Sequence, residues 1–331
     1  MRSIISSLFI ILSALLTTIS VGDSFGVNLT GNGNHRYLPV PNWITLERGM
    51  QLGSTHGDVD VGSDDTIYFT TDTKNSIMAY SPDGQLLRTL AEDFVGIHAL
   101  ITRVENGEEF IYAAHLQGKQ AVKFTKQGGV VWTIPWPEES GKYENIGQYR
   151  PTGIAVGPDG DIYIADGYGQ NWIHQYSKDR EYIRSFGGKG KEPGKFNTCH
   201  AIDIDMRGEQ PLLIICDREA NRIQHFDLEG NFVSVSTEHL RRPTELDIWG
   251  DYVAVSELSG RVVILDKNNA PVAFLGDNPD RSQWSNNGVA TEKWVDGIFT
   301  APHGIAYDSK GNLYVQDWNK FGRVSKLLRL P

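Results

Sequence analysis

The sequence predicts an all-β protein, a six-bladed β-propeller, and three observations support this fold class. Six segments of roughly forty residues repeat one pattern of apolar strands joined by turns. The turns are rich in Gly, Asp and Asn, which is typical of tight connections between antiparallel strands. The last segment ends at Pro331 after only three strands, whereas an unassigned strand-like segment precedes the first repeat.

Each repeat contains the strands of one blade. The six repeats begin near His56, His98, Thr152, His200, Thr244 and His303. In the third repeat a strand at 153–156 turns at 158–160 into a second strand at 161–166, and the sixth repeat has the same arrangement at 304–317. A third and a fourth strand complete the blade. Because such a blade cannot bury both faces alone, the blades must stack around an axis.

The two ends of the repeat region indicate how the ring closes. We expect residues 43–46, Trp-Ile-Thr-Leu, to supply the missing outer strand of the last blade, so that the propeller spans 43–331. Closure by an N-terminal strand removes exposed strand edges, which invite aggregation. Residues 23–42 are rich in Gly and Asn, and we expect them to form a loose leader.

The first 22 residues have the order of an export signal. Arg2 precedes an apolar run at 4–16, and small and polar residues follow at 17–22. An uncleaved membrane anchor is the alternative, but the apolar run is shorter than the ~20 residues that cross a bilayer. We therefore expect residues 1–22 to be removed, leaving a secreted or periplasmic protein with no membrane partner.

Composition and charge narrow the other partners. The chain holds 41 Asp and Glu against 31 Lys and Arg, for a formal net charge of −10. A surface of this charge repels phosphate backbones and no dense basic stripe offsets it, so we expect no nucleic acid partner. We also expect a monomer. In an oxidising compartment the only two cysteines, Cys199 and Cys216, flank one hairpin and could form a disulfide bond.

Two segments exceed the repeat length. They are 135–150 and 277–300, and the second contains Trp284 and Trp294. Loops of this length often form the wall or lid of a site, and a purely decorative insertion is the alternative. The sequence leaves both open.

Histidines recur at one position of the repeat, just before the innermost strand. Rotation about the axis turns equivalent positions into a ring, and His98, His200 and His303 occupy repeats two, four and six. We expect these imidazoles to approach the axis with near three-fold symmetry. Zinc sites that do chemistry keep three protein ligands and an open fourth position. Alternatively, the position tolerates any polar residue beside a water-filled channel, since Thr152 and Thr244 also occupy it.

The remaining histidines have less definite assignments. His56 starts repeat one, so it is either a fourth imidazole near the ring or a group that supports the ligands. Five others lie outside the ring position and are assigned no role: His35, His115, His174, His225 and His239.

Three stretches of the chain carry a family resemblance. They lie at 150–156, 162–168 and 216–224 and resemble NHL-repeat propellers, and more narrowly the peptidyl-α-hydroxyglycine α-amidating lyases. The resemblance covers nearly the whole mature chain and is densest between 149 and 232. It implies the same fold and an activity on the C-terminus of a peptide or on a small hydroxylated amide.

The resemblance also implies a set of site residues. The family's three zinc-binding histidines map onto His98, His200 and His303, its Asp-Gly-Tyr tyrosine onto Tyr168, and its Asp-Arg-Glu arginine onto Arg218. Zinc would lower the pKa of the substrate hydroxyl, Tyr168 would take the proton, and Arg218 would orient the carboxylate or stabilise developing charge. The hemiaminal would then collapse to a peptide amide and glyoxylate.

Taken without the resemblance, these residue types also have structural interpretations. Tyr168 could pack within its blade, and Arg218 could pair with Asp166 or Glu219. An acidic residue recurs at the end of the second strand, and we expect it to serve the architecture of the blades. The residues at this position are Asp166, Asp217, Glu257 and Asp317.

The chain departs from the family pattern at several positions. The family's repeat-one arginine falls near Asp72 and Thr73, and Lys74 is the nearest cation; Ala301 and Gly169 replace a methionine and a cysteine. The family carries calcium in its channel, so structural Ca²⁺ is the second metal implied, and these departures leave it and the substrate open. A non-catalytic propeller that binds protein or carbohydrate on its top face is the alternative function. Calcium-dependent lactone hydrolysis fits less well, because such sites use mainly Glu, Asn and Asp.

Overall fold

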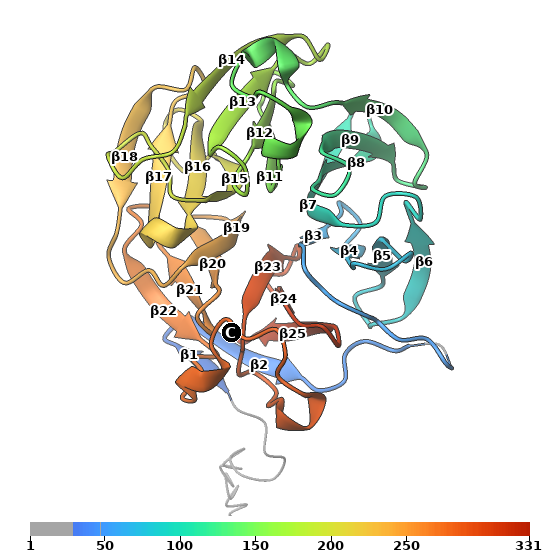
Figure 1. Ribbon diagram of the computed structural model, residues 1–331. Coiled ribbons are helices and arrows are strands. Elements are labelled where there is room, and N and C mark those ends of the chain that lie inside the picture. Colours follow the sequence, from blue (N-terminus) through green and yellow to red (C-terminus); the bar gives the residue numbers. More distant parts are fainter. Residues whose placement is uncertain (1–28, 47) are drawn as a thin grey trace, which may run out of the picture.

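The computed structural model describes residues 29–46 and 48–331, which form six antiparallel sheets arranged around a central axis (Figure 1). This arrangement confirms the six-bladed propeller. The signal segment expected at 1–22 lies outside the described residues. Among the residues that are described, no helix is long and apolar enough to cross a membrane.

Blades one to five have four strands each. In each of them the strands follow the chain order from the axis outwards, so the first strand is innermost (Figure 1). Blades one and two contain β3 (Val59–Val61), β4 (Ile67–Thr70), β5 (Ile77–Tyr80), β6 (Leu86–Leu90), β7 (Ile97–Glu105), β8 (Glu108–His115), β9 (Gln120–Thr125) and β10 (Val130–Ile134). Blades three to five contain β11 (Gly153–Val156), β12 (Ile162–Ala165), β13 (Trp172–Tyr176), β14 (Tyr182–Gly187), β15 (Cys199–Asp205), β16 (Leu212–Asp217), β17 (Arg222–Phe226), β18 (Phe232–Ser236), β19 (Pro243–Trp249), β20 (Tyr252–Glu257), β21 (Arg261–Leu265) and β22 (Pro271–Leu275).

The sixth blade joins the two ends of the chain. It contains β23 (Pro302–Tyr307), β24 (Leu313–Asp317), β25 (Arg323–Arg329), β2 (His35–Val40) and β1 (Thr30–Asn32), in that order from the axis outwards. Strand β2 pairs antiparallel with β25, with Leu38 opposite Leu328 (Figure 1). An N-terminal strand therefore closes the ring, as the sequence predicted.

The strand that closes the ring is not the one expected. The prediction that 43–46 forms it is wrong, and so is the expectation of a loose leader over the residues of β2. Side chains of β2 alternate between buried and exposed, which is the pattern of a strand that packs one face on its blade, and the short strand β1 lies outside it at the edge. Asn42, with φ of 50°, then turns the chain away. Trp43 packs through its side chain instead, and its indole N–H donates to Pro82 O over 2.9 Å.

The core lies between the blades. Among the described residues, six hydrophobic clusters each join two neighbouring blades, so the apolar contact runs around the whole ring. The central strands are buried on both faces, which explains their nearly continuous runs of Ile, Val and Ala. Burial between blades, rather than within one blade, therefore holds the ring together.

The two cysteines do not form a disulfide bond. Both thiols are free and buried. Cys199 packs in the cluster between blades three and four, whereas Cys216 packs between blades four and five. In the β15–β16 pairing, Cys199 lies opposite Asp217 and Cys216 lies opposite Ala201, so the side chains point to opposite faces of the sheet.

In blades three, four and six, the recurring acidic residue binds the segment that precedes the inner strand. Asp166, Asp217 and Asp317 are fully buried and accept backbone N–H groups from the segment that leads into the inner strand of the same blade. The distances are 2.6, 2.7 and 2.6 Å to the amides of Arg150, Asn197 and Ala301. Buried backbone amides need such partners, and the expected architectural role is confirmed.

Candidate metal centre

The ring positions coincide with irregularities in the inner strands. The pairing between first and second strands skips one residue in blades two, four, five and six, and the skipped residues are His98, His200, Thr244 and His303. A β-bulge leaves its extra residue outside the ladder and re-aims its side chain. Each histidine is therefore free to project towards the axis while its strand continues in register.

The three imidazoles meet at the axis. Their ring centres are 4.8 Å apart for His98 and His200, 4.9 Å for His98 and His303, and 4.7 Å for His200 and His303. All three side chains are buried. The near-equilateral triangle is the three-fold arrangement expected from the repeat.

Each imidazole is oriented by the next blade. Nδ1 of His98 lies 2.8 Å from Thr152 O, Nδ1 of His200 lies 2.7 Å from Thr244 O, and Nδ1 of His303 lies 2.8 Å from Gly57 O. A carbonyl oxygen can only accept, so each Nδ1 carries the proton and donates it. The Nε2 lone pairs are therefore left for the axis, as in histidines that bind metals.

The chemistry of this donor set suits a metal. Burial lowers the pKa of all three histidines well below 6.5, so the imidazoles are neutral at physiological pH. Nε2 of His303 is buried and has no hydrogen-bond partner within the described part of the chain. An orphaned buried acceptor is costly, and a cation at the axis would satisfy it. Three neutral imidazoles with one open side match the ligand set of a catalytic zinc.

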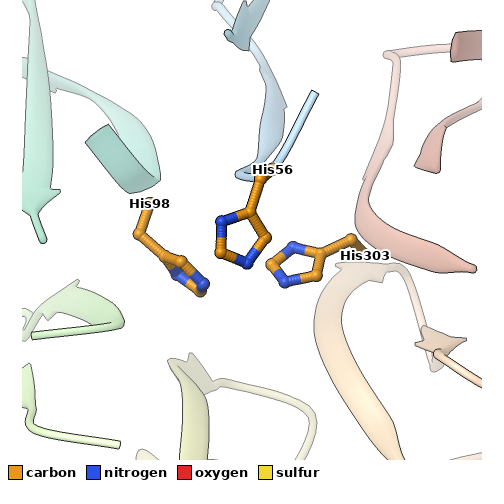
Figure 2. Close-up of side chains that lie close together, drawn as sticks. All are labelled: His56, His98 and His303. Atoms are coloured by element: carbon orange, nitrogen blue, oxygen red, sulfur yellow. The ribbon is translucent and has the colours of Figure 1, made fainter. Parts of the chain in front are cut away.

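His56 joins the same cluster from the first blade. Its ring centre is 5.1 Å from that of His98 and 5.0 Å from that of His303, and the ligand atoms of these three side chains lie within 4.8 Å of one another (Figure 2). Its ring stacks on Tyr168 at 6.2 Å. Burial and the charge of Arg218 lower the pKa of His56 to about 4. We call His56, His98, His200 and His303 the histidine layer.

Tyr168 and Arg218 extend from the loops that follow β12 and β16. Tyr168 Oη lies 2.9 Å from His200 Nε2 and 3.2 Å from His98 Nε2, and it accepts a 2.9 Å hydrogen bond from Arg218. Burial raises the pKa of Tyr168 above 10, and the Arg218 charge offsets part of this. Arg218 also pairs with Glu219 at 2.9 Å, and it forms no pair with Asp166. Arg218 therefore contacts the site through Tyr168 and also belongs to the ion pair with Glu219.

A cleft opens beside the histidine layer. Its volume is about 510 Å³, and His56, Tyr168, Trp318, Arg150 and Lys189 line it together with Gly, Asn and Thr residues. Sequence reasoning did not predict Trp318, Arg150 or Lys189 as site residues. Arg150 and Lys189 come from segments without a counterpart in the other repeats, so repeat register could not single them out. Trp318 directly follows the recurring acidic residue Asp317, as Arg218 follows Asp217, and this shared position could have indicated it. Of the residues around the missing repeat-one arginine, none lines the cleft.

Comparisons with known proteins place the chain near peptide-amidating enzymes. The NHL repeat family matches residues 149–176. Peptidyl-glycine alpha-amidating monooxygenase B of Xenopus laevis is 30% identical over 179 residues, which cover 51% of this chain and 19% of that protein. Peptidyl-alpha-hydroxyglycine alpha-amidating lyase 1 of Drosophila melanogaster is 28% identical over 199 residues, or 54% of this chain and 35% of that protein. The chain contains an NHL repeat within a six-bladed propeller.

Solved structures agree with the fold of this NHL-repeat propeller. A streptogramin B lyase has a TM-score of 0.56 and 16% identity, covering 91% of this chain and 97% of that one. A virginiamycin B lyase from Staphylococcus aureus has a TM-score of 0.57 and 14% identity, covering 92% and 100%. Identities this low support the architecture alone. The sequence matches span about half of this chain and little more than a third, at most, of the curated relatives named above.

A second ring of side chains lies deeper in the propeller channel. Five carboxylates line a small internal cavity of about 30 Å³, large enough for a water molecule or a small cation. We call this set the carboxylate layer: Asp58, Asp60, Asp203, Glu245 and Asp247. The signal missed in the sequence is alternation, since inner strands carry acidic residues two positions apart, at 58 and 60 and at 245 and 247.

Burial makes ionisation of the carboxylate layer unfavourable. Burial raises the pKa of all five groups, to about 6 for Asp60 and about 7 for Asp203. Their hydrogen-bond partners are backbone and hydroxyl groups, such as the Leu246 amide 3.1 Å from Glu245. No Lys or Arg among the residues lining the cavity neutralises them. Arg103, outside that lining, lowers the pKa of Asp203 against the larger effect of burial.

Both insertions of the propeller reach the rim of the site. In the first, η1 (Glu138–Ser140) and η2 (Ile146–Gln148) lead to Arg150 in the cleft, and Tyr143 donates to Asp166 over 2.8 Å. The second, 277–300, contains η4 (Arg281–Gln283) and η5 (Thr291–Lys293), and its Ser285 accepts a 3.0 Å bond from Arg242, a partner of Glu219. The first insertion therefore contributes Arg150 to the lining of the cleft, whereas no residue of 277–300 lines it.

Proposed function

We propose that this propeller is a zinc-dependent lyase that cleaves a hydroxyglycine-type hemiaminal to an amide and glyoxylate. The observation that carries the proposal is that the rings of three buried histidines meet at the axis, with Nε2 of His98 and of His200 beside the Tyr168 hydroxyl. That hydroxyl also accepts a hydrogen bond from Arg218. The relationship to peptide-amidating enzymes supports the choice of reaction over others that a three-histidine site can perform.

The ligands of the zinc would be His98, His200 and His303. When bound there, zinc supplies Lewis acidity that acidifies a substrate hydroxyl. His56, which the cluster also brings within range, defines the competing ligand set of His56, His98 and His303. We favour the set of His98, His200 and His303. Each of the three occupies a β-bulge, donates to a backbone carbonyl of the next blade, and lies in every second blade of the ring.

Tyr168 is the proton carrier in this reaction. Its phenolic oxygen takes the hydroxyl proton of the substrate as the carbonyl of glyoxylate forms and the C–N bond breaks, and the proton passes to the departing amide nitrogen. Arg218, which donates to that oxygen over 2.9 Å, stabilises the negative charge while the proton is away. Burial raises the pKa of Tyr168 even though Arg218 is nearby, so the phenol would first have to lose its own proton, which the positive charge of a bound zinc would favour, before it could accept the substrate proton.

We propose structural calcium as the second metal, held by the carboxylate layer. Calcium prefers carboxylate oxygens, and this layer concentrates five of them in one small cavity. Zinc prefers the nitrogen donors of the histidine layer. We further propose that the mature chain is secreted or periplasmic and monomeric, which N-terminal sequencing and light scattering of the exported protein would test.

The test of the lyase combines an activity with a metal measurement. A peptide that ends in α-hydroxyglycine is incubated with the purified protein, and glyoxylate is assayed. Stoichiometric zinc should disappear in His200→Ala and persist in His239→Asn, a control histidine that is exposed and lies outside the ring. Zinc loss in His56→Ala with retention in His200→Ala would select the competing ligand set.

Two outcomes would contradict the proposal in different ways. Native protein without zinc would remove the catalytic centre and favour the non-catalytic propeller that binds its partner on the top face. Stoichiometric zinc without glyoxylate would leave the centre and overturn the reaction assigned to it.

A further inference from the structure

We propose that Arg150 forms an anion-binding subsite in the cleft and receives the carboxylate of the substrate. The inference rests on the proposed function for the identity of the reacting group, but not for the binding of an anion. It assigns the carboxylate to a residue that the first insertion delivers, and it leaves Arg218 to Tyr168 and Glu219.

The backbone fixes Arg150 beside Tyr168. The amide of Arg150 donates to Asp166 over 2.6 Å, and its carbonyl accepts from the Tyr168 amide over 3.3 Å. Tyr143 of the same insertion holds the other oxygen of Asp166 at 2.8 Å. The Arg150 guanidinium carbon consequently lies 5.9 Å from the centre of the Tyr168 ring. A group bound by this guanidinium is therefore close to the proposed proton carrier.

The guanidinium of Arg150 is free to bind a ligand. It is exposed and forms no ion pair or side-chain hydrogen bond with any residue from 29 to 46 or from 48 to 331. Two other arginines at the rim are engaged: Arg218 and Arg242 share Glu219, at 2.9 and 2.6 Å. A planar guanidinium without an internal partner can donate two parallel hydrogen bonds to a carboxylate.

The cleft around Arg150 favours anions. Its lining residues include Arg150, Lys189 and His56 but no Asp or Glu, in a chain whose formal charge is −10. A basic cleft on an acidic protein concentrates anionic ligands at its mouth.

The proximity of Arg150 to Tyr168 suits a substrate whose carboxylate is near its hydroxyl. In an α-hydroxyglycine terminus one carbon carries both groups. With the hydroxyl at Tyr168 Oη, the carboxylate would be within reach of the exposed Arg150 side chain, whose guanidinium carbon is 5.9 Å from the centre of the tyrosine ring. Arg218 is less suited to this task, because its Nε and one terminal nitrogen already donate to Glu219 and Tyr168.

Binding of a probe that cannot react tests the inference separately from the lyase. N-acetyl-phenylalanyl-glycine lacks the hydroxyl group, and its methyl ester lacks the charge. Calorimetry on the zinc-loaded protein should show a preference for the acid over the ester of about tenfold or more, because charged hydrogen bonds of this kind contribute that much. Arg150→Gln should abolish the preference, and Arg150→Lys should restore part of it.

Lys178→Gln is the matched control, since Lys178 is exposed in the same blade at the turn between β13 and β14, away from the cleft. It should keep the preference. The inference is overturned if Arg150→Gln still prefers the acid, or if Lys189→Gln loses the preference while Arg150→Gln keeps it. Zinc content must remain stoichiometric in Arg150→Gln, because loss of zinc would indicate a structural role.

Kinetics distinguish binding from positioning. With the α-hydroxyglycine peptide, Arg150→Gln should raise KM by about tenfold and leave kcat within about twofold. A fall in kcat at constant KM would contradict a carboxylate-binding role. If the native protein forms no glyoxylate but Arg150→Gln loses the acid preference, the lyase proposal fails and the anion subsite stands.

Discussion

The histidine layer and the carboxylate layer lie in one channel, yet they solve the problem of buried polarity in opposite ways. In the histidine layer His98, His200 and His303 each donate Nδ1–H to a carbonyl of the next blade, and neutral Nε2 lone pairs remain. In the carboxylate layer the oxygens accept amides such as that of Leu246, and burial raises the pKa of every carboxyl group. The first layer could bind a metal without releasing protons, whereas the second would release protons to bind one.

If the two layers bind the metals proposed above, one fold symmetry would separate two metals. Rotation brings equivalent positions together at every level of the channel, so the donor type at each level is set by a few residues of the inner strands. Nitrogen donors at the mouth suit zinc, and oxygen donors below suit calcium. Only the upper level opens into the cleft, so only that level can reach a substrate.

Removing the proton carrier should have the largest effect, and it should touch only the upper layer. Tyr168→Phe keeps the ring that stacks on His56 but removes the hydroxyl, so kcat for glyoxylate release should fall by about 10²–10⁴-fold. Zinc and calcium contents, measured by elemental analysis, should not change.

Tyr163→Phe is the control in the same blade, because the Tyr163 hydroxyl donates to Leu228 O far from the cleft. This variant should keep its kcat. Equal loss of activity in both variants would mean that Tyr168 acts through packing rather than through its proton.

The second prediction concerns a variant that changes the carboxylate layer and leaves the histidine layer intact. Glu245→Gln removes one of five carboxylates, so calcium content and the rise in Tm on adding calcium should both decrease. Zinc content should remain stoichiometric. Glu209→Gln, an exposed acidic residue in the turn after β15, should change neither metal. Loss of zinc from Glu245→Gln would show that the two layers are coupled and not separate.

The two layers were also unequally visible in the sequence. His98, His200 and His303 could be chosen from the sequence because a repeat converts register into position on a ring. The carboxylate layer was missed because its residues do not share one position of the repeat: they lie two and four residues after His56, three after His200, and one and three after Thr244. Whether the histidines bind zinc is a prediction that register alone cannot establish.

Where the repeat is broken, the sequence says less. Arg150 and Lys189 belong to segments with no equivalent in other blades, so nothing in the chain indicates that they meet at the cleft. Trp43 was assigned to a strand because it starts an apolar run, but burial alternation in β2 and pairing with β25 decided the closure. Apolar content marks what is buried, and only pairing shows which segment is a strand.

The smallest expected effect concerns the ionisation of the carboxylate layer. It changes the free energy of unfolding, and the direction of this change with pH is defined. In calcium-free protein, burial raises the pKa of Asp203 to about 7 from an unfolded value near 3.8. The native state then binds the proton more tightly than the unfolded state, so stability is highest below about pH 4 and is lost as pH rises towards 7. Asp203→Asn removes this cost, so at pH 8 it should raise the free energy of unfolding by about 1–2 kcal/mol.

Urea titrations of the Asp203→Asn variant at several pH values should show the gain in unfolding free energy shrinking as pH falls from 7 to 4. In saturating calcium the same variant should be less stable than the wild type, because it has lost a ligand. A gain that is independent of pH would show that Asp203 is not ionised in the folded protein, and the contrast between the layers would then rest on geometry alone.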